Sequence, residues 1–240
     1  MTGIYYQKHP LDGCRERMRR ADEHLAELER EIELMCEKQA HAVPFDLNPT
    51  PPHGAINVRL PPETFAGIRL GTLVGEICYN LRCVLDYLVY ALAELDSGTP
   101  QKGTQFPIMD AARDFAGRGK AMLNGVNPAH VAAIERLQPY MGCQWTGRLR
   151  DLSNMDKHRH IVPGGGNSRV TVYSGLERDD LDRIHGFKRK APHPLTGEDV
   201  DVKVHIAGEL TFADGTAVID TIHEIKTGVA DTLRQFETEF

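Results

Sequence analysis

Residues 73–92 read LVGEICYNLRCVLDYLVYAL. Leucine or isoleucine recurs at every third or fourth position of this stretch, at Leu73, Ile77, Leu81, Leu85, Leu88 and Leu92. Such spacing aligns apolar side chains along one face of an α-helix. The flanking residues continue the pattern and predict one long helix over residues 63–96. Gly67, Gly71 and Gly75 lie four residues apart, and they either allow another helix to approach closely or mark a break near Gly71.

The same spacing predicts three further long helices, over residues 11–39, 146–161 and 219–240. Two shorter helices are expected over residues 110–122 and 128–137, the second with Asn127 as its cap and Pro128 in its first turn. Four long helices together with these short ones favour an up-down bundle.

A change of period after residue 162 predicts a small β element. Pro163-Gly164-Gly165-Gly166 interrupts the helical pattern, and residues 169–174 and 201–206 then alternate in the manner of strands. Residues 213–216 are typical of a hairpin turn, and another short strand is expected over residues 55–60. We therefore predict a mainly α (α+β) fold in a single domain, 1–240. The bundle takes residues 11–162 and 219–240, and a small antiparallel β insertion takes about 168–218.

Charge and cysteine content exclude several classes of protein. The chain has 28 Lys plus Arg and 34 Asp plus Glu, a formal net charge of −6, which argues against a general nucleic-acid coat but leaves a local basic site open. Its five cysteines include no Cys-x-x-Cys pair, so neither a disulfide framework nor a thiolate zinc site is expected. The sequence has no signal-peptide pattern and no run of about 18 apolar residues. We expect a cytoplasmic protein that does not interact with membranes.

The candidate chemistry lies in one polar block, residues 148–160, of which only three are apolar. Arg150, Asn154 and His158 are four residues apart, so on a helix they share one face. These three side chains suit the binding and polarisation of a phosphate. His158 is the natural group for proton transfer near neutral pH.

Asp156 follows Leu149 and Leu152 on the apolar side of the same helix, and we expect it to face inward. A buried carboxylate needs a partner, which Lys157, Arg159 or a residue of the middle helix can supply. The alternative is that the block is purely structural, held by buried hydrogen bonds and surface ion pairs.

The middle helix adds Asn80 and Asp86 as candidate binding residues, because an inward polar group must be hydrogen-bonded. Arg82 lies four residues before Asp86 and can form an ion pair with it. His158 and His160 are two apart and diverge on a helix, so no metal is expected. The glycines form no phosphate-cradling motif, and no cofactor is expected either.

Three segments together resemble a group of uncharacterised bacterial proteins and, more distantly, the HEPN superfamily of helical bundles. They are residues 80–92, 105–108 and 152–159. That superfamily includes RNA-cleaving toxins and defence nucleases as well as non-catalytic nucleotide-binding members. Its signature is an Arg, usually followed by a polar residue, and then a His. Asn154 and His158 match the polar residue and the His, whereas Ser153 occupies the position of the Arg.

The resemblance implies a protein that binds nucleotide or RNA. It also implies a homodimer. If the protein is one of the catalytic members, its activity is that of a metal-independent endoribonuclease. Two alternatives remain open at this stage. One is a non-catalytic binding or interaction protein, which sealed and paired Asp156 and His158 would favour. The other is an enzyme with a small-molecule pocket between the helices over residues 63–96 and 146–161. An open cleft holding Asn154, His158 and an arginine would instead favour the HEPN-like hypothesis.

Overall fold

The computed structural model describes residues 9–42, 53–58, 68–158, 161, 168–173, 187–192, 196–208 and 210–240. The chain forms two compact units. The first consists of Met1–Glu27, Gly71–Ile161 and Ile219–Phe240, and the second of Leu28–Leu70 and Val162–Val218. The first unit follows the predicted bundle, and the second includes residues 28–70 in addition to the predicted insertion. Whether they make a single domain stays a prediction.

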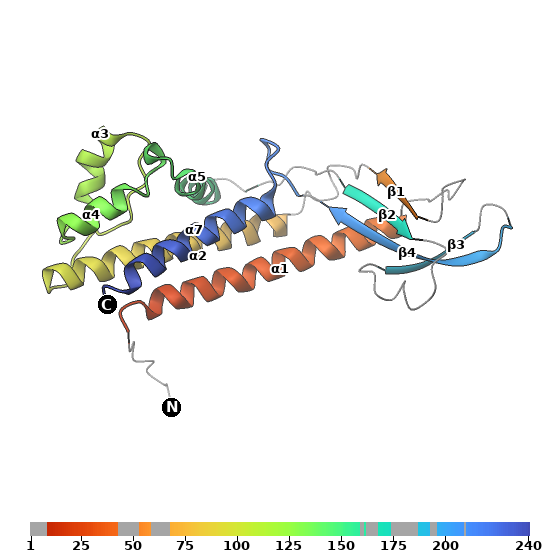
Figure 1. Cartoon of the computed structure of the whole chain (residues 1–240), viewed down its shortest axis with the longest axis horizontal. Coiled ribbons are helices and arrows are strands. Elements are labelled where there is room, and N and C mark those ends of the chain that lie inside the picture. Colours follow the sequence, from red (N-terminus) through yellow and green to blue (C-terminus); the bar gives the residue numbers. More distant parts are fainter. Residues whose placement is uncertain are drawn as a thin grey trace, which may run out of the picture. The chain divides into compact units, whose positions relative to one another are not determined.

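Four long helices build the bundle: α1 (Asp12–Ala42), α2 (Ile68–Ser97), α5 (Gln144–His158) and α7 (Val218–Glu237) (Figure 1). Contacts between side chains show in which direction each helix runs relative to its neighbours. Cys14 Sγ donates to Val84 O at 3.5 Å, and His24 Nδ1 lies 3.4 Å from Glu76 Oε2. Because residue numbers rise along α1 as they fall along α2, these two helices are antiparallel.

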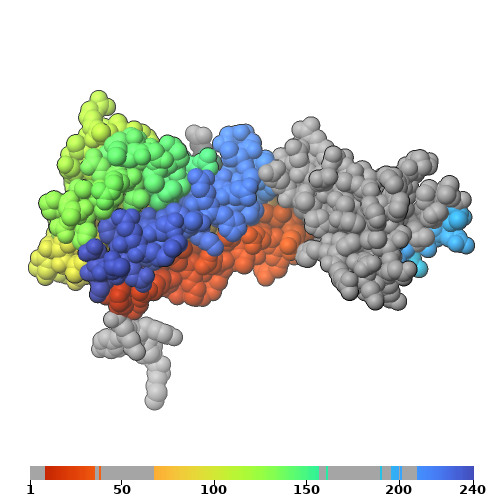
Figure 2. Space-filling model, viewed as in Figure 1, coloured from red at the N-terminus to blue at the C-terminus, as the bar shows by residue number. Residues whose placement is uncertain are grey.

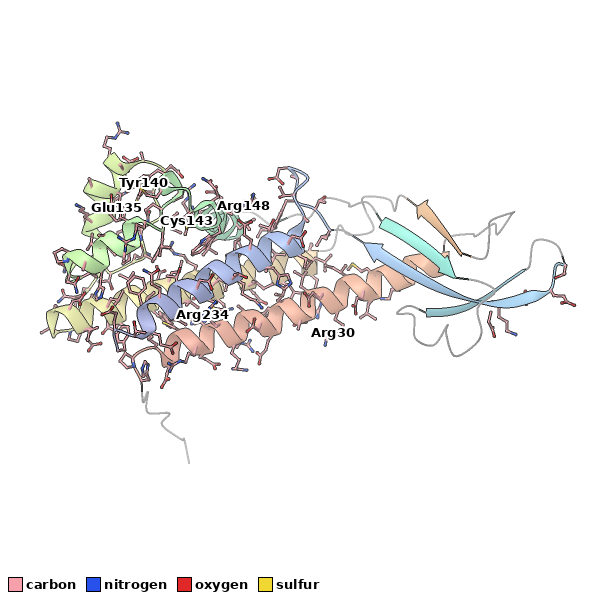
Figure 3. The ribbon with its side chains drawn as sticks, viewed as in Figure 1. Arg30, Glu135, Tyr140, Cys143, Arg148 and Arg234 are labelled. Carbon is pink, nitrogen blue, oxygen red and sulfur yellow. The ribbon has the colours of Figure 1, made fainter. Side chains whose placement is uncertain are left out.

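Helices α5 and α7 are also antiparallel. Arg148 Nη1 donates to Glu224 Oε2 at 2.7 Å, and Arg148 is labelled in Figure 3. One turn earlier on α5, the indole of Trp145 lies against Gly228, which is one turn later on α7.

Helix α7 returns along α1, which closes the bundle. Lys226 Nζ donates to Asp22 Oδ1 at 2.8 Å, and Arg15 pairs with Glu237. Figure 2 shows α7 lying between α1 and the part of the first unit that contains α5. The four helices therefore alternate in direction, and the predicted up-down, mainly α bundle is confirmed.

Short elements connect α2 to α5: α3 (Ala112–Asp114), the π-helical turn η2 (Phe115–Gly119), α4 (Pro128–Glu135) and the 3₁₀ turn η3 (Pro139–Met141). Asn127 caps α4 as predicted, its side chain accepting a 2.9 Å hydrogen bond from His130 N. The single helix expected over residues 110–122 is wrong, because α3 gives way to η2. Two glycines within η2, Gly117 and Gly119, weaken the preference for a continuous α-helix.

Hydrophobic periodicity correctly locates the core of the bundle. All six leucine and isoleucine residues of the α2 spine are buried, as are Leu149 and Leu152 of α5. The buried face of α7 consists of Ile222, Ile225, Val229, Leu233 and Phe236. Burial of apolar surface at about 25 cal/mol per Å² makes these faces the main source of stability.

Glycines on α2 allow close contact with the end of α5, and α2 continues unbroken past Gly71. A Cβ atom added at Gly75 would overlap the carboxylate of Asp156, and one added at Gly71 would overlap the carbonyl oxygen of Ile161. Of the two readings of this glycine spacing, the close contact is therefore correct. Gly67 lies outside the described residues.

The second unit contains a four-stranded antiparallel sheet in the order β1-β2-β4-β3. The strands are β1 (His53–Val58), β2 (Ser168–Tyr173), β3 (Phe187–Pro192) and β4 (Asp199–Gly208). Val170 of β2 pairs with Ile206 of β4. The sequence predicts β1, β2 and β4 to within a few residues, and it misses β3, a charged edge strand without apolar alternation. The expected turn at residues 213–216 is closed by a bridge between Thr211 and Ala217.

The contact of Gly228 with Trp145 leads to a test of the packing. Gly228→Ala should lower the free energy of unfolding by about 1–3 kcal/mol, the usual cost of overpacking, although alanine is the better helix former. Trp145 is the only tryptophan of the chain, so its fluorescence reports the change during denaturant unfolding.

Gly117→Ala is the matched control. A Cβ there meets no atom within 4 Å. It should leave stability unchanged or raise it by about 0.4–1 kcal/mol. Equal effects of the two variants would contradict the close contact between α5 and α7.

Candidate functional site

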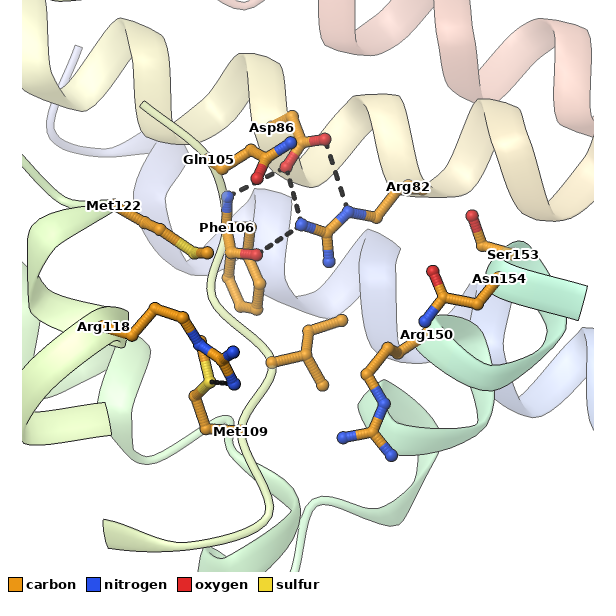
Figure 4. A pocket seen from close by; sticks show the side chains of 11 residues that line it. Arg82, Asp86, Gln105, Phe106, Met109, Arg118, Met122, Arg150, Ser153 and Asn154 are labelled. Carbon is orange, nitrogen blue, oxygen red and sulfur yellow. Dashed lines mark hydrogen bonds and ion pairs between the residues drawn. The ribbon is translucent and has the colours of Figure 1, made fainter. Parts of the chain in front are cut away.

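A pocket of about 260 Å³ lies between α2 and α5 in the first unit (Figure 4). We call it the arginine pocket, because it holds one arginine from α2, one from η2 and one from α5. Its lining residues are Arg82, Asp86, Gln105, Phe106, Ile108, Met109, Arg118, Met122, Arg150, Ser153 and Asn154. A pocket shared by these two helices is what the small-molecule alternative anticipates.

An ion pair on α2 fixes one wall of the pocket. Arg82 Nη2 lies 3.0 Å from Asp86 Oδ1, one turn along the helix, as predicted from their spacing. Asp86 Oδ1 also accepts a 2.9 Å hydrogen bond from Phe106 N, and Arg82 donates to Phe106 O (Figure 4). Both main-chain polar groups of Phe106 are therefore satisfied by the pair, while its ring is fully buried.

Gln138 holds the next part of the same wall. Its side chain is fully buried and uses both ends of the amide. Oε1 accepts from Met109 N at 2.9 Å, and Nε2 donates to Pro107 O at 2.9 Å and to Ile134 O at 3.0 Å. Together with the Arg82–Asp86 pair, these bonds give residues 106–109 a fixed shape beside the pocket.

The three guanidinium groups differ in how their charges are compensated. Arg82 is paired with the partly buried Asp86. Arg150 lies 2.8 Å from Asp151 and 2.7 Å from Asp110, and hydrogen bonds to these two carboxylates raise its pKa. Both carboxylate side chains are more than 60% exposed, so water weakens their hold on Arg150.

Arg118 has no carboxylate partner among the residues that the structure describes. Its Nη2 approaches Met109 Sδ at 3.7 Å, a weak contact. The pocket thus presents one guanidinium without a counter-charge and a second whose counter-charges are exposed.

Two polar side chains of α5 complete the lining. Ser153 is 5% exposed, and its hydroxyl has no hydrogen-bond partner within the described part of the chain. A buried hydroxyl without a partner costs about 1–3 kcal/mol, so such groups usually contact a ligand or ordered water. Asn154 is exposed at the rim, and, as predicted, it shares a face with Arg150.

Asn80 lies away from this pocket. Although it is buried as expected, it faces α1, where its Oδ1 accepts from Arg17 Nη1 at 3.1 Å and its Nδ2 donates to Glu76 O at 2.8 Å. Asn80 and Asp86 are six residues apart, which puts them on different sides of α2. Asn80 is therefore a satisfied structural residue, and Asp86 alone lines the pocket.

The other predicted residues lie at the end of α5. Asp156 faces α2 as expected, with its oxygens against Gly75, but the residue is exposed, so the expectation of a buried carboxylate is wrong. The α5 backbone includes Lys157 and His158, but their side chains lie outside the described part of the structure, as does the whole of Arg159.

Sequence patterns missed Arg118 and Gln138. Arg118 belongs to a π-helical turn, an element that often occurs at functional sites, but nothing in its spacing sets it apart from other surface arginines. Gln138 makes bonds to residues 29 and 31 positions away, and periodicity carries no signal for such contacts.

The described residues offer little support for thiolate chemistry, a metal site or a membrane-spanning helix. Burial raises the pKa of the Cys14 and Cys78 thiols to about 12, so neither supplies a thiolate near neutral pH. In the described ranges, no three His, Cys, Asp or Glu side chains are grouped as a metal site would require. Among the described helices, none combines the length and apolarity needed to cross a membrane.

Fold and site together define a helical bundle with a cationic pocket between two of its antiparallel helices. Comparison with known proteins adds no relative: no family model, no curated protein and no solved structure matches the chain.

The role of Gln138 leads to a second prediction. Gln138→Leu should lower the free energy of unfolding by about 2–3 kcal/mol, because the buried Met109 amide and Pro107 carbonyl lose their partners. Hydrogen exchange at the Met109 amide should become faster than in the unmodified protein. Gln144→Leu, at an exposed glutamine with one 3.3 Å bond, should change stability by less than about 0.5 kcal/mol. Unchanged exchange at Met109 would show that Gln138 does not hold this wall.

Proposed function

We propose that the protein binds a phosphate-bearing ligand, a nucleotide or an RNA phosphate, in the arginine pocket. The observation that carries this proposal is the convergence of Arg82, Arg118 and Arg150 on one small cavity, which also contains the Ser153 hydroxyl, a group without a hydrogen-bond partner among the described residues. Guanidinium groups bind phosphate oxygens through paired, charge-assisted hydrogen bonds. A ligand oxyanion would supply the missing partner of Arg118 and Ser153 together.

The balance of charges supports an anion over a neutral ligand. Three arginines and one aspartate line the pocket. The carboxylates paired with Arg150 are exposed, so a phosphate can replace them at small cost. Asp86 stays with Arg82 and Phe106, which keeps the wall in place when a ligand enters.

The size of the pocket favours the phosphoryl end of a larger molecule. Its volume of about 260 Å³ is smaller than the 300–1,000 Å³ typical of sites that enclose a whole drug-sized ligand. The fixed segment 106–109 gives a preformed wall, which lowers the entropy lost on binding.

A second candidate function is metal-independent cleavage of RNA, as the resemblance to HEPN nucleases implies. Asn154 stands at the rim of the pocket, and α5 remains helical through His158, one turn further on. In this hypothesis His158 moves a proton while Asn154 and an arginine hold the scissile phosphate.

The resemblance also implies a homodimer. The described cysteines are free thiols, which supports a cytoplasmic location.

Phosphate binding is testable with inorganic pyrophosphate as the probe. Arg118→Gln should weaken binding about tenfold by calorimetry, because it removes one charge-assisted contact. Ser153→Ala should also weaken binding without lowering stability, because its hydroxyl has no described partner to lose. Arg113→Gln, on the adjacent α3 and 89% exposed outside the pocket, is the control and should bind normally. Equal affinities of all four proteins would exclude the arginine pocket as the site.

Cleavage is tested separately, with single-stranded RNA in the presence of a metal chelator. We expect the unmodified protein to cut and His158→Ala to lose all activity, while His223→Ala, at an exposed histidine of α7, retains it. If neither the unmodified protein nor His158→Ala cleaves, or both cleave equally, the nuclease hypothesis fails and phosphate binding is unaffected.

A further inference from the structure

A second cavity, of about 910 Å³, adjoins the arginine pocket. We call it the tyrosine groove. It lies between the start of α1 and the second half of α2, and Tyr87 and Tyr90 supply its aromatic surface. Asp86 and Gln105 line both cavities, so these two residues form the boundary between them.

Both tyrosine rings are exposed, and side-chain contacts hold the ring of Tyr87 in place. Tyr87 and Tyr90 are 41% and 40% exposed, although both lie on the helix that forms the centre of the bundle. Tyr87 is held by Arg17, whose Nη2 donates to its hydroxyl at 3.2 Å and whose guanidinium lies 5.6 Å from its ring centre. Its other neighbour is Gly13, where an added Cβ would come within 3.1 Å of the ring. A fixed, exposed aromatic ring is a suitable platform for stacking a nucleobase.

The polar groups of the groove suit the edge of a base better than a phosphate. Glu94 is exposed one turn after Tyr90, and no ion-pair partner for it occurs in the described ranges. Carboxylates accept hydrogen bonds from the exocyclic amines of bases. Thr104 and Gln105 add further hydrogen-bonding groups, whereas the lining contains no Lys or Arg.

The two cavities therefore divide the chemistry of one nucleotide. The arginines gather on one side of Asp86 and Gln105, and the tyrosines gather on the other side. A nucleotide has the same division, with a charged phosphate at one end and a flat, weakly polar base at the other. The groove, at about 910 Å³, has ample room for a base and its ribose.

We propose that the tyrosine groove binds an amine-bearing base, adenine, cytosine or guanine, of a nucleotide whose 5′-phosphate occupies the arginine pocket. The proposal rests on the proposed phosphate binding and specifies its ligand. The base stacks on Tyr90 beside Tyr87, and its amine donates to Glu94. A free mononucleotide and the 5′-phosphorylated end of an RNA chain offer the same chemistry.

The test compares adenosine 5′-monophosphate with ribose 5-phosphate, which has the phosphate and sugar but no base. The unmodified protein should bind the nucleotide about tenfold more tightly, a difference typical of one stacked base. Tyr90→Leu should abolish that preference while the affinity for ribose 5-phosphate stays the same. Tyr90→Phe should keep it, because the ring remains. Tyr79→Leu is the matched control, since Tyr79 is 50% exposed on the same helix but lies outside the groove.

Two further arms define the base and the source of the nucleotide. Glu94→Gln should reduce the preference for adenosine over uridine monophosphate. A 5′-phosphorylated diadenosine binds more tightly than the mononucleotide if the ligand is an RNA end, and more weakly if it is a free nucleotide.

The outcomes separate this inference from the function on which it rests. If ribose 5-phosphate binds and Arg118→Gln weakens it, but the base adds no affinity, the groove does not bind a base and only this inference is overturned. If the unmodified protein binds neither adenosine 5′-monophosphate nor ribose 5-phosphate, the proposed function itself is overturned. Competition by the polyamine spermidine for the groove would identify a cation site and also contradict the inference.

Discussion

The ion pair between Arg82 and Asp86 is the interaction on which the site depends. It neutralises two charges on one turn of α2, and it also satisfies both main-chain polar groups of Phe106, a residue whose ring is fully buried. An exposed pair at this spacing would contribute little. Here the pair is partly buried and joins α2 to the segment that follows it, so removal of either partner leaves an unpaired charge and an unpaired backbone group near the core.

The same pair determines how the two cavities relate. Asp86 faces both the arginine pocket and the tyrosine groove, and its carboxylate is already occupied by Arg82 and Phe106. It therefore acts as a fixed wall and repels a ligand phosphate less than an unpaired carboxylate would. A cationic pocket is compatible with the net charge of −6, because the carboxylates next to the pocket are paired with arginines, and those of Asp110 and Asp151 are also exposed.

Periodicity predicts the parts of this structure that depend on repetition along one element. The buried spine of α2 and the inward Leu149 and Leu152 follow directly from helical spacing, and so does the common face of Arg150 and Asn154. The cap at Asn127 is equally local. Contacts between distant segments carry no such signal. Gln138 reaches the wall of the pocket from the turn between α4 and η3, and Arg118 reaches it from a π-helical turn, so neither could be assigned from spacing.

Asn80 and Asp156 show the limits of assigning direction and burial from sequence. Helical spacing places Asn80 inward, but a bundle helix has several inward sides, and Asn80 faces α1 while Asp86 faces the pocket. Asp156 follows the apolar residues of α5 by four positions, yet it lies near the helix end, where solvent reaches it. An amphipathic pattern therefore distinguishes core from surface well in the middle of a helix and less well at its last turn.

Ser153 shows how the arginine pocket stays open. In this chain the side chain at 153 is small, buried and directed into a pocket of about 260 Å³, which three arginines from other positions already surround. An arginine at 153 would fill much of that volume and add a fourth cation among the others. A serine leaves the space open and contributes a hydroxyl beside Arg82, Arg118 and Arg150, which is what the proposed phosphate binding requires.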